Sequence, residues 1–150
     1  MPATFETARD EILAAFKTRW DLDSGAHNGG TVPAVRYEGT ELAGLPPHDA
    51  PWAKVTIRHT LGSQASLASD VGLRRFEKLG IATVQVFAPL EKASGLVQAE
   101  RLAMVAKKAF EGRSTAGGVW FRNTRIVEVG VDGPWFQMNV IAEFSYDEFT

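Results

Sequence analysis

The sequence predicts an α+β fold, in which a mostly antiparallel β-sheet carries two helices packed on one of its faces. One observation is a period-two alternation near the C-terminus, which is typical of a strand with one buried side. The apolar side of this strand holds Phe136, Met138, Val140, Ala142, Phe144 and Tyr146. The other observation is a pair of segments whose apolar residues recur three and four positions apart, as in amphipathic helices. The expected order is helix, loop with a short strand, two strands, helix, two strands.

The C-terminal third predicts a long antiparallel hairpin. Residues 119–129 are rich in β-branched and aromatic side chains, and residues 130–134 are a cluster of turn formers. The alternating strand of 135–146 follows directly. We therefore expect this hairpin at the centre of the sheet, with one helix against its apolar face.

Two helices are expected on one face of the sheet. Thr4 can cap the first helix, which should run to about Arg19. Its apolar stripe is Phe5, Ala8, Ile12, Leu13, Phe16 and Trp20. The second helix is expected over about 95–111, with Gly112 as its C-terminal cap. Its stripe is dominated by alanine, which permits a close approach to a sheet, and comprises Leu96, Ala99, Leu102, Ala103, Ala106, Ala109 and Phe110.

Two more strands are expected between the helices. Residues 52–61 alternate apolar and polar side chains, and residues 73–88 are extended, with Gly80 predicting a bulge or bend. The small, polar segment 62–72 predicts a long loop between them. Ahead of these strands, the Gly- and Pro-rich stretch 21–51 shows only one short strand, 34–37.

Composition indicates one domain over residues 1–150. The absence of cysteine excludes disulfides, thiolate chemistry and Cys-ligated zinc. A formal charge of −2 with both signs scattered along the chain is unlike a basic nucleic-acid binder. The chain holds no apolar run of membrane-spanning length and no apolar core of a signal peptide near its start, so we expect a soluble protein that is not exported by that route.

The sequence carries no recognisable catalytic or cofactor motif. It lacks a phosphate loop, a dinucleotide fingerprint, a His-Glu-x-x-His pair and a nucleophile elbow. His27 and His48 lie in the loop stretch without further ligands at metal-binding spacing, and solvated loop histidines are the expectation. His59 falls on the apolar side of its strand, where we expect a hydrogen-bonded structural residue rather than a catalytic one. We therefore expect no enzymatic activity, no metal and no cofactor.

Four segments resemble tail terminator-like proteins of long-tailed bacteriophages and prophages, a family long described as a phage-related domain of unknown function. They are PWAKVTIRH (51–59), IATVQVFAPL (81–90), FEGRSTAGGVWFRNTRIVEVG (110–130) and WFQMNVIAEFSYDE (135–148). The resemblance implies a tail-terminator-like α+β subunit of a virion, assembled in the host cytoplasm. Such a subunit forms a hexameric ring on the head-proximal end of the tail tube, stops tube growth and offers the head-joining surface. Its implied partners are copies of itself, the major tail tube protein and a connector or stopper protein, and phage DNA passes through the ring without sequence-specific binding.

A ring of this kind needs a heterologous contact between unlike surfaces of neighbouring subunits. Candidate interface residues on the charged strand are Arg74, Arg75 and Lys78, which could meet acids such as Glu128, Glu143 or Asp147. On the hairpin the candidates are Trp120, Arg122 and Trp135, since Trp and Arg are frequent interface anchors.

Two other readings stay open at the level of sequence. Another neck component, such as a head-tail stopper or a tail completion protein, is the rival among virion proteins. A small-molecule-binding or enzymatic α+β domain with its site in the long loops is the rival from a different class.

Overall fold

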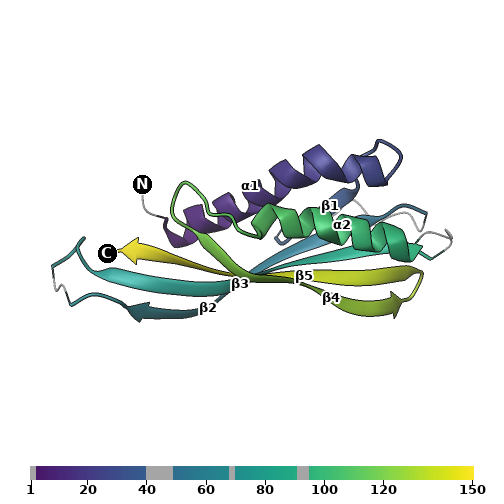
Figure 1. Cartoon of the computed structure of the whole chain (residues 1–150). Helices are drawn as coiled ribbons and strands as arrows, with labels where there is room; N and C mark the ends of the chain where they lie inside the picture. The colour runs from purple at the N-terminus through teal and green to yellow at the C-terminus, as the bar shows by residue number, and fades with distance from the viewer. Residues whose placement is uncertain (1–2, 40–48, 68–69, 91–94) are drawn as a thin grey trace.

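The computed structural model describes residues 3–39, 49–67, 70–90 and 95–150 (Figure 1). The helical elements are α1 (Phe5–Asp23), the 3-10 turn η1 (Ser24–His27) and α2 (Gly95–Phe110). The strands are β1 (Ala34–Tyr37), β2 (Trp52–Gln64), β3 (Arg75–Pro89), β4 (Trp120–Asp132) and β5 (Trp135–Phe149). No helix in these ranges is long and apolar enough to cross a membrane.

The strands form one sheet in the order β1-β2-β3-β5-β4. Every neighbouring pair is antiparallel except β1 with β2. Both helices lie on the same face of this long, twisted sheet (Figure 1). The α+β prediction is therefore confirmed. The expectation that the whole hairpin lies at the centre of the sheet is only half right, because β5 is internal whereas β4 is an edge strand.

Helix α1 begins as its sequence predicts. The side chain of Thr4 accepts a hydrogen bond from the backbone N–H of Thr7, and the side chain of Thr7 accepts one from the backbone N–H of Thr4. The helix continues to Asp23, four residues past the predicted end. Its buried residues are Ala8, Ile12, Phe16 and Trp20. Phe5 is an exception to the predicted stripe, because it is 54% exposed.

Helix α2 packs its alanine-rich stripe against the sheet, and the predicted members of that stripe are buried except Leu96. Opposite them on β5, the side chains of Met138, Val140, Ala142, Phe144 and Tyr146 are also buried, as the alternation predicts. Phe136 is only partly buried. Small side chains on the helix let it approach this surface closely, so one continuous core fills the space between helices and sheet.

The turn of the hairpin is shorter than expected. Strand β4 runs to Asp132 and β5 starts at Trp135, so only Gly133 and Pro134 connect them. The register of the pair shifts between Glu128 and Gly130, and Gly130 has φ +106°, a value that favours glycine. Gly130, which the sequence places in the turn, therefore lies at a bulge within strand β4.

Two predictions for β2 and β3 are corrected by the structure. Gly80 is a regular ladder position, whereas the bulge lies opposite it on β2, between His59 and Leu61. A side chain at position 80 would collide with the ring of Phe144, which explains the glycine. The predicted loop 62–72 is shorter, because Gly62, Ser63 and Gln64 pair with β3. Backbone hydrogen bonds suffice to extend a hairpin through small polar residues.

Candidate assembly interface

The far end of the β2–β3 hairpin extends beyond both helices (Figure 1). We call its described residues, 60–67 and 70–78, the arm. Strand β2 is buried at Ala53, Val55 and Ile57, yet every residue from 60 to 65 is exposed. The arm also carries exposed large apolar side chains, namely Leu61, Leu67, Val71 and Leu73. Exposed apolar side chains gathered in one place mark interaction surfaces, so the arm is the first candidate interface.

The three predicted cations of the charged strand all lie in the arm. Arg74 donates from Nε to the backbone carbonyl of Thr150 at 3.2 Å. Arg75 donates to the carbonyl of Ala65 and lies 3.7 Å from the carboxylate of Asp147. The Nζ atom of Lys78 lies 5.6 Å from the ring centroid of Phe76. The contacts of Arg74 with Thr150 and of Arg75 with Asp147 hold the arm to the C-terminal end of the chain. Arg75 remains exposed, and Arg74 and Lys78 are half-exposed.

A histidine joins the root of the arm to α1. His59 Nε2 and Tyr146 Oη are hydrogen-bonded at 2.9 Å, and the ring of Phe5 stacks on the imidazole with centroids 4.2 Å apart. Burial lowers the pKa of His59 and raises the pKa of Tyr146 to about 12. The side chain of Glu148 accepts the backbone N–H of Phe5 at 2.9 Å, at the positive end of the helix. His59 is thus a hydrogen-bonded residue that ties elements together, as the sequence predicts.

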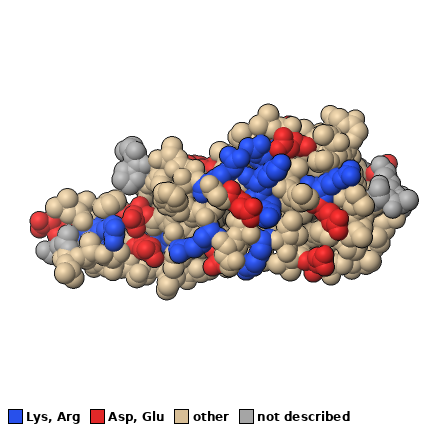
Figure 2. All heavy atoms as spheres, in the orientation of Figure 1, with Lys and Arg blue, Asp and Glu red and all other residues tan. Residues whose placement is uncertain are grey.

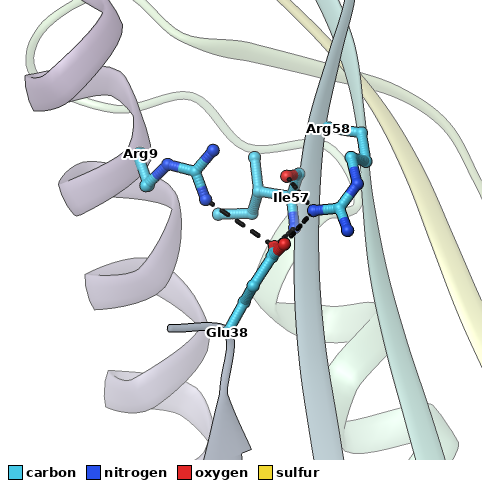
Figure 3. Close-up of polar contacts among 4 residues, drawn as sticks. All are labelled: Arg9, Glu38, Ile57 and Arg58. Atoms are coloured by element: carbon cyan, nitrogen blue, oxygen red, sulfur yellow. Dashed lines mark hydrogen bonds and ion pairs between the residues drawn. The ribbon is translucent and has the colours of Figure 1, made fainter. Parts of the chain in front are cut away.

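The edge of β2 is capped by a residue that sequence reasoning missed, Glu38. Strand β1 pairs with residues 52–55 only, and Glu38 follows its last residue. Its carboxylate accepts the backbone N–H of Ile57 at 3.4 Å and a hydrogen bond from Arg58, and it lies 3.8 Å from Nη1 of Arg9 (Figure 3). The hydrogen bond from Arg58 lowers the pKa of Glu38. A side chain thereby ends the strand pairing at this edge.

The opposite face of the sheet is covered by no described helix (Figure 1). Trp120 pairs with Ser145 and Arg122 with Glu143, and both candidate side chains are exposed there, Trp120 at 64%. Arg125 forms an ion pair with Glu143 at 3.1 Å. The predicted positions of Trp120 and Arg122 on an accessible surface are therefore consistent with a binding role.

Trp135 lies in a different environment from Trp120. It is 8% exposed and belongs to a cluster with Trp52 and Phe87. The rings of Trp52 and Phe87 stack at 4.2 Å, the ring of Trp135 meets Trp52 edge-on at 6.1 Å, and the guanidinium of Arg36 lies 4.9 Å from the Trp52 ring. Within the subunit, Trp135 therefore contributes to packing on the face away from the helices.

The acids proposed to meet the arm separate into two groups. Glu143 and Asp147 are already paired with Arg125 and Arg75 of the same subunit. Glu128 forms no ion pair within the described ranges. It lines a groove of about 500 Å³ between α2 and the β4–β5 hairpin, together with Glu100, Met104, Ile126 and Met138. We call these five residues the acidic groove.

Charge is otherwise mixed over the helix-bearing side. Figure 2 shows basic and acidic side chains interspersed from one end of the molecule to the other. On α1 and α2 several are neighbours one helical turn apart, as in the pairs Lys17–Asp21, Arg19–Asp23 and Lys107–Glu111. Exposed pairs of this kind contribute under about 1 kcal/mol each, so they keep the surface solvated rather than define a site.

The described residues hold no group of three or more His, Asp or Glu side chains placed to bind a metal ion. His27 ends η1, and its backbone carbonyl accepts a hydrogen bond from Gln98 at 3.0 Å. His48 lies outside the described residues.

No family model and no curated protein sequence matches this chain. A solved structure of a protein designated only by a serial number has a similar fold, with a TM-score of 0.64. It is 17% identical to this chain, and the match covers 95% of this chain and 97% of the other. At that identity the likeness shows the α+β fold over nearly the whole chain and nothing beyond it.

Proposed function

We propose that this protein is a structural subunit of a bacteriophage tail terminator. In this role it assembles as a hexameric ring on the head-proximal end of the tail tube, ends tube polymerisation and provides the surface to which the head joins. The observation that carries the proposal is the arm, a strand hairpin that extends past the helices with four large apolar side chains exposed. A surface of this kind needs a protein partner to bury it.

The sheet supports the same role through its open face. Trp120 and Arg122 are exposed on an edge strand, where a neighbouring protein can reach both side chains. The arm and this face are unlike surfaces of one subunit, which is what a closed ring of identical copies requires. The partners in this proposal are other copies of the chain, the major tail tube protein and a connector or stopper protein, with DNA passing through the ring. The proposal assigns the protein no catalytic step and no cofactor.

Tube assembly in vitro tests the proposal. The major tail tube protein of the same phage or prophage is polymerised with and without this chain, and tube lengths and ends are measured by electron microscopy. We expect shorter tubes that carry a ring at one end only. Unchanged tube lengths together with bare ends would overturn the proposal.

The same preparation separates the rival neck components. A head-tail stopper or tail completion protein would bind the connector or the finished tail and leave tube growth unchanged. Pull-down of the chain with purified tube protein and, separately, with purified connector distinguishes these roles. We expect capture by tube ends in the absence of the connector.

A further inference from the structure

Two separate surfaces of this subunit carry exposed apolar side chains. One set is on the arm, where Leu67 is fully exposed and Val71 is 84% exposed. Another is on the outer side of α2, where Met104 is 55% exposed and forms one wall of the acidic groove. In Figure 1 the arm and the β4–β5 turn point away from each other. Two unlike apolar surfaces on one chain favour head-to-tail association of identical copies, because a two-fold dimer would use one surface twice.

The charges of the two surfaces are opposite. The arm contributes Arg74, Arg75 and Lys78 against Asp70 and Glu77, three cations less two acids for a net charge of +1, whereas the acidic groove contributes Glu100 and Glu128 and no basic side chain. Neither glutamate forms an ion pair within the described part of the chain. A basic segment in this groove would place cations beside both carboxylates and would select its orientation, as complementary charges do at protein interfaces.

The groove also matches the arm in polarity. Its apolar lining is formed by Met104, Ile126 and Met138, and its volume of about 500 Å³ holds several side chains. Methionine adapts its shape to an incoming group. No helix lies over the arm (Figure 1), and its leucines are exposed, so a second copy can reach them without unfolding the subunit.

We infer that the arm of one subunit docks into the acidic groove of a second copy of this chain. Leu67, Val71 and Leu73 supply the apolar contact, and Arg74, Arg75 and Lys78 meet Glu100 and Glu128. The inference rests on the proposed function in that it specifies the contact between ring neighbours. In this contact Glu100 and Glu128 take the place of Glu143, which is paired with Arg125, and they add to the Asp147 carboxylate that Arg75 already meets within its own subunit.

Charge reversal tests this contact. In one variant Arg74, Arg75 and Lys78 are changed to Glu, and in the other Glu100 and Glu128 are changed to Lys. Each variant alone brings like charges together, and we expect its self-association to weaken at least about tenfold in sedimentation experiments at low salt. Mixed in equal amounts, the two variants present opposite charges at every contact, so we expect co-assembly with alternating subunits and recovery of the wild-type size.

A control matched to the groove variant carries Glu6→Lys and Asp10→Lys, which make the same change in charge on the exposed side of α1. It should associate like the wild type, and thermal melts should show that every variant is folded. Wild-type protein that stays monomeric at its solubility limit overturns the inference, as does failure of the two folded variants to co-assemble. If the charge-reversed variants still self-associate and still cap tubes, the inferred contact is wrong and the proposed function stands. If the chain self-associates through this contact but never caps tubes, the proposed function is wrong and the inferred contact stands.

Discussion

Strands β2 and β3 run through both the central part of the sheet and the arm, yet the two regions differ in how far their side chains are buried. In the centre, Val55, Ile57 and Val84 are at most 1% exposed under the helices, whereas in the arm the ladder continues with its side chains in solvent. Backbone hydrogen bonds give the arm its shape but contribute little net stability. Burial under α1 and α2 stabilises the centre. Substitutions of side chains in the arm should therefore change the free energy of unfolding only slightly.

The strongest way to sharpen this comparison is to empty part of the centre. Phe144 is 1% exposed and contacts the ring of His59 edge-on at 5.3 Å. Phe144→Ala removes a large core aromatic, so the free energy of unfolding should fall by about 3–5 kcal/mol. Urea denaturation followed by circular dichroism measures this change. A loss below about 1 kcal/mol would mean that the central core is not packed around Phe144.

Two glycines on the paired strands give a matched second test. An alanine at position 80 meets the Phe144 ring and the backbone carbonyl of Arg58, neither of which can move freely. At position 62, in the arm, it meets only the flexible end of Lys78, whose nearest atoms would be 3.1 Å away. We expect Gly80→Ala to cost about 1–3 kcal/mol and Gly62→Ala to stay within about 0.5 kcal/mol. Equal melting temperatures for the two variants would contradict the difference in packing.

Much of the fold could be predicted because burial leaves a periodic trace in sequence. The alternation around Val140 and the spacing of Ile12, Phe16 and Trp20 each report one buried side. Strand order left no such trace, and the placement of β4 at an edge was missed. Residues 62–64 were predicted as part of a loop because Gly62 and Ser63 are poor strand formers, whereas the pairing with β3 decides their conformation.

The candidate interface was harder to predict, because burial and ion pairing depend on residues distant in sequence. Trp120 and Trp135 read alike as interface anchors, yet one is exposed and the other is packed against Trp52. Glu38 resembles any loop acid until the end of β1 places it beside Ile57. The strand pattern did place Arg74, Arg75 and Lys78 together at one end of the sheet. The acidic groove could not be predicted from the sequence, because residues of α2, β4 and β5 form it jointly.

The boundary between centre and arm should respond to pH through His59. Its pKa is lowered by burial, and Nδ1 is buried without a hydrogen-bond partner in the described structure, so the charged imidazole is disfavoured in the folded state. Below the ordinary pKa of about 6.5 the unfolded chain binds a proton that the folded chain resists, so stability falls as pH falls through that value. Denaturation at pH 7.5 and 5.5 should show this loss in the wild type.

Substitution of His59 separates this contribution from the titration of carboxylates. His59→Gln retains a polar side chain without a titration in this range, and we expect it to reduce the stability difference between the two pH values. His27→Gln is the control at a histidine on η1. An identical pH dependence for wild type and His59→Gln would remove His59 from this role.

The smallest expected effect on stability is at Leu67 in the arm, and a leucine of the centre, Leu102, serves as its comparison. Leu102 on α2 is fully buried, and Leu67 in the arm is fully exposed. Leu102→Ala should cost about 2–5 kcal/mol, because it leaves a cavity under the sheet. Leu67→Ala should change the free energy of unfolding by less than about 0.5 kcal/mol, because the side chain is in contact with solvent in both the folded and the unfolded chain. The same Leu67→Ala protein should nevertheless associate more weakly with itself, measured by sedimentation at matched concentrations. A loss of fold stability at Leu67 as large as at Leu102 would show that the arm is part of the subunit core, and its apolar side chains would then need no partner.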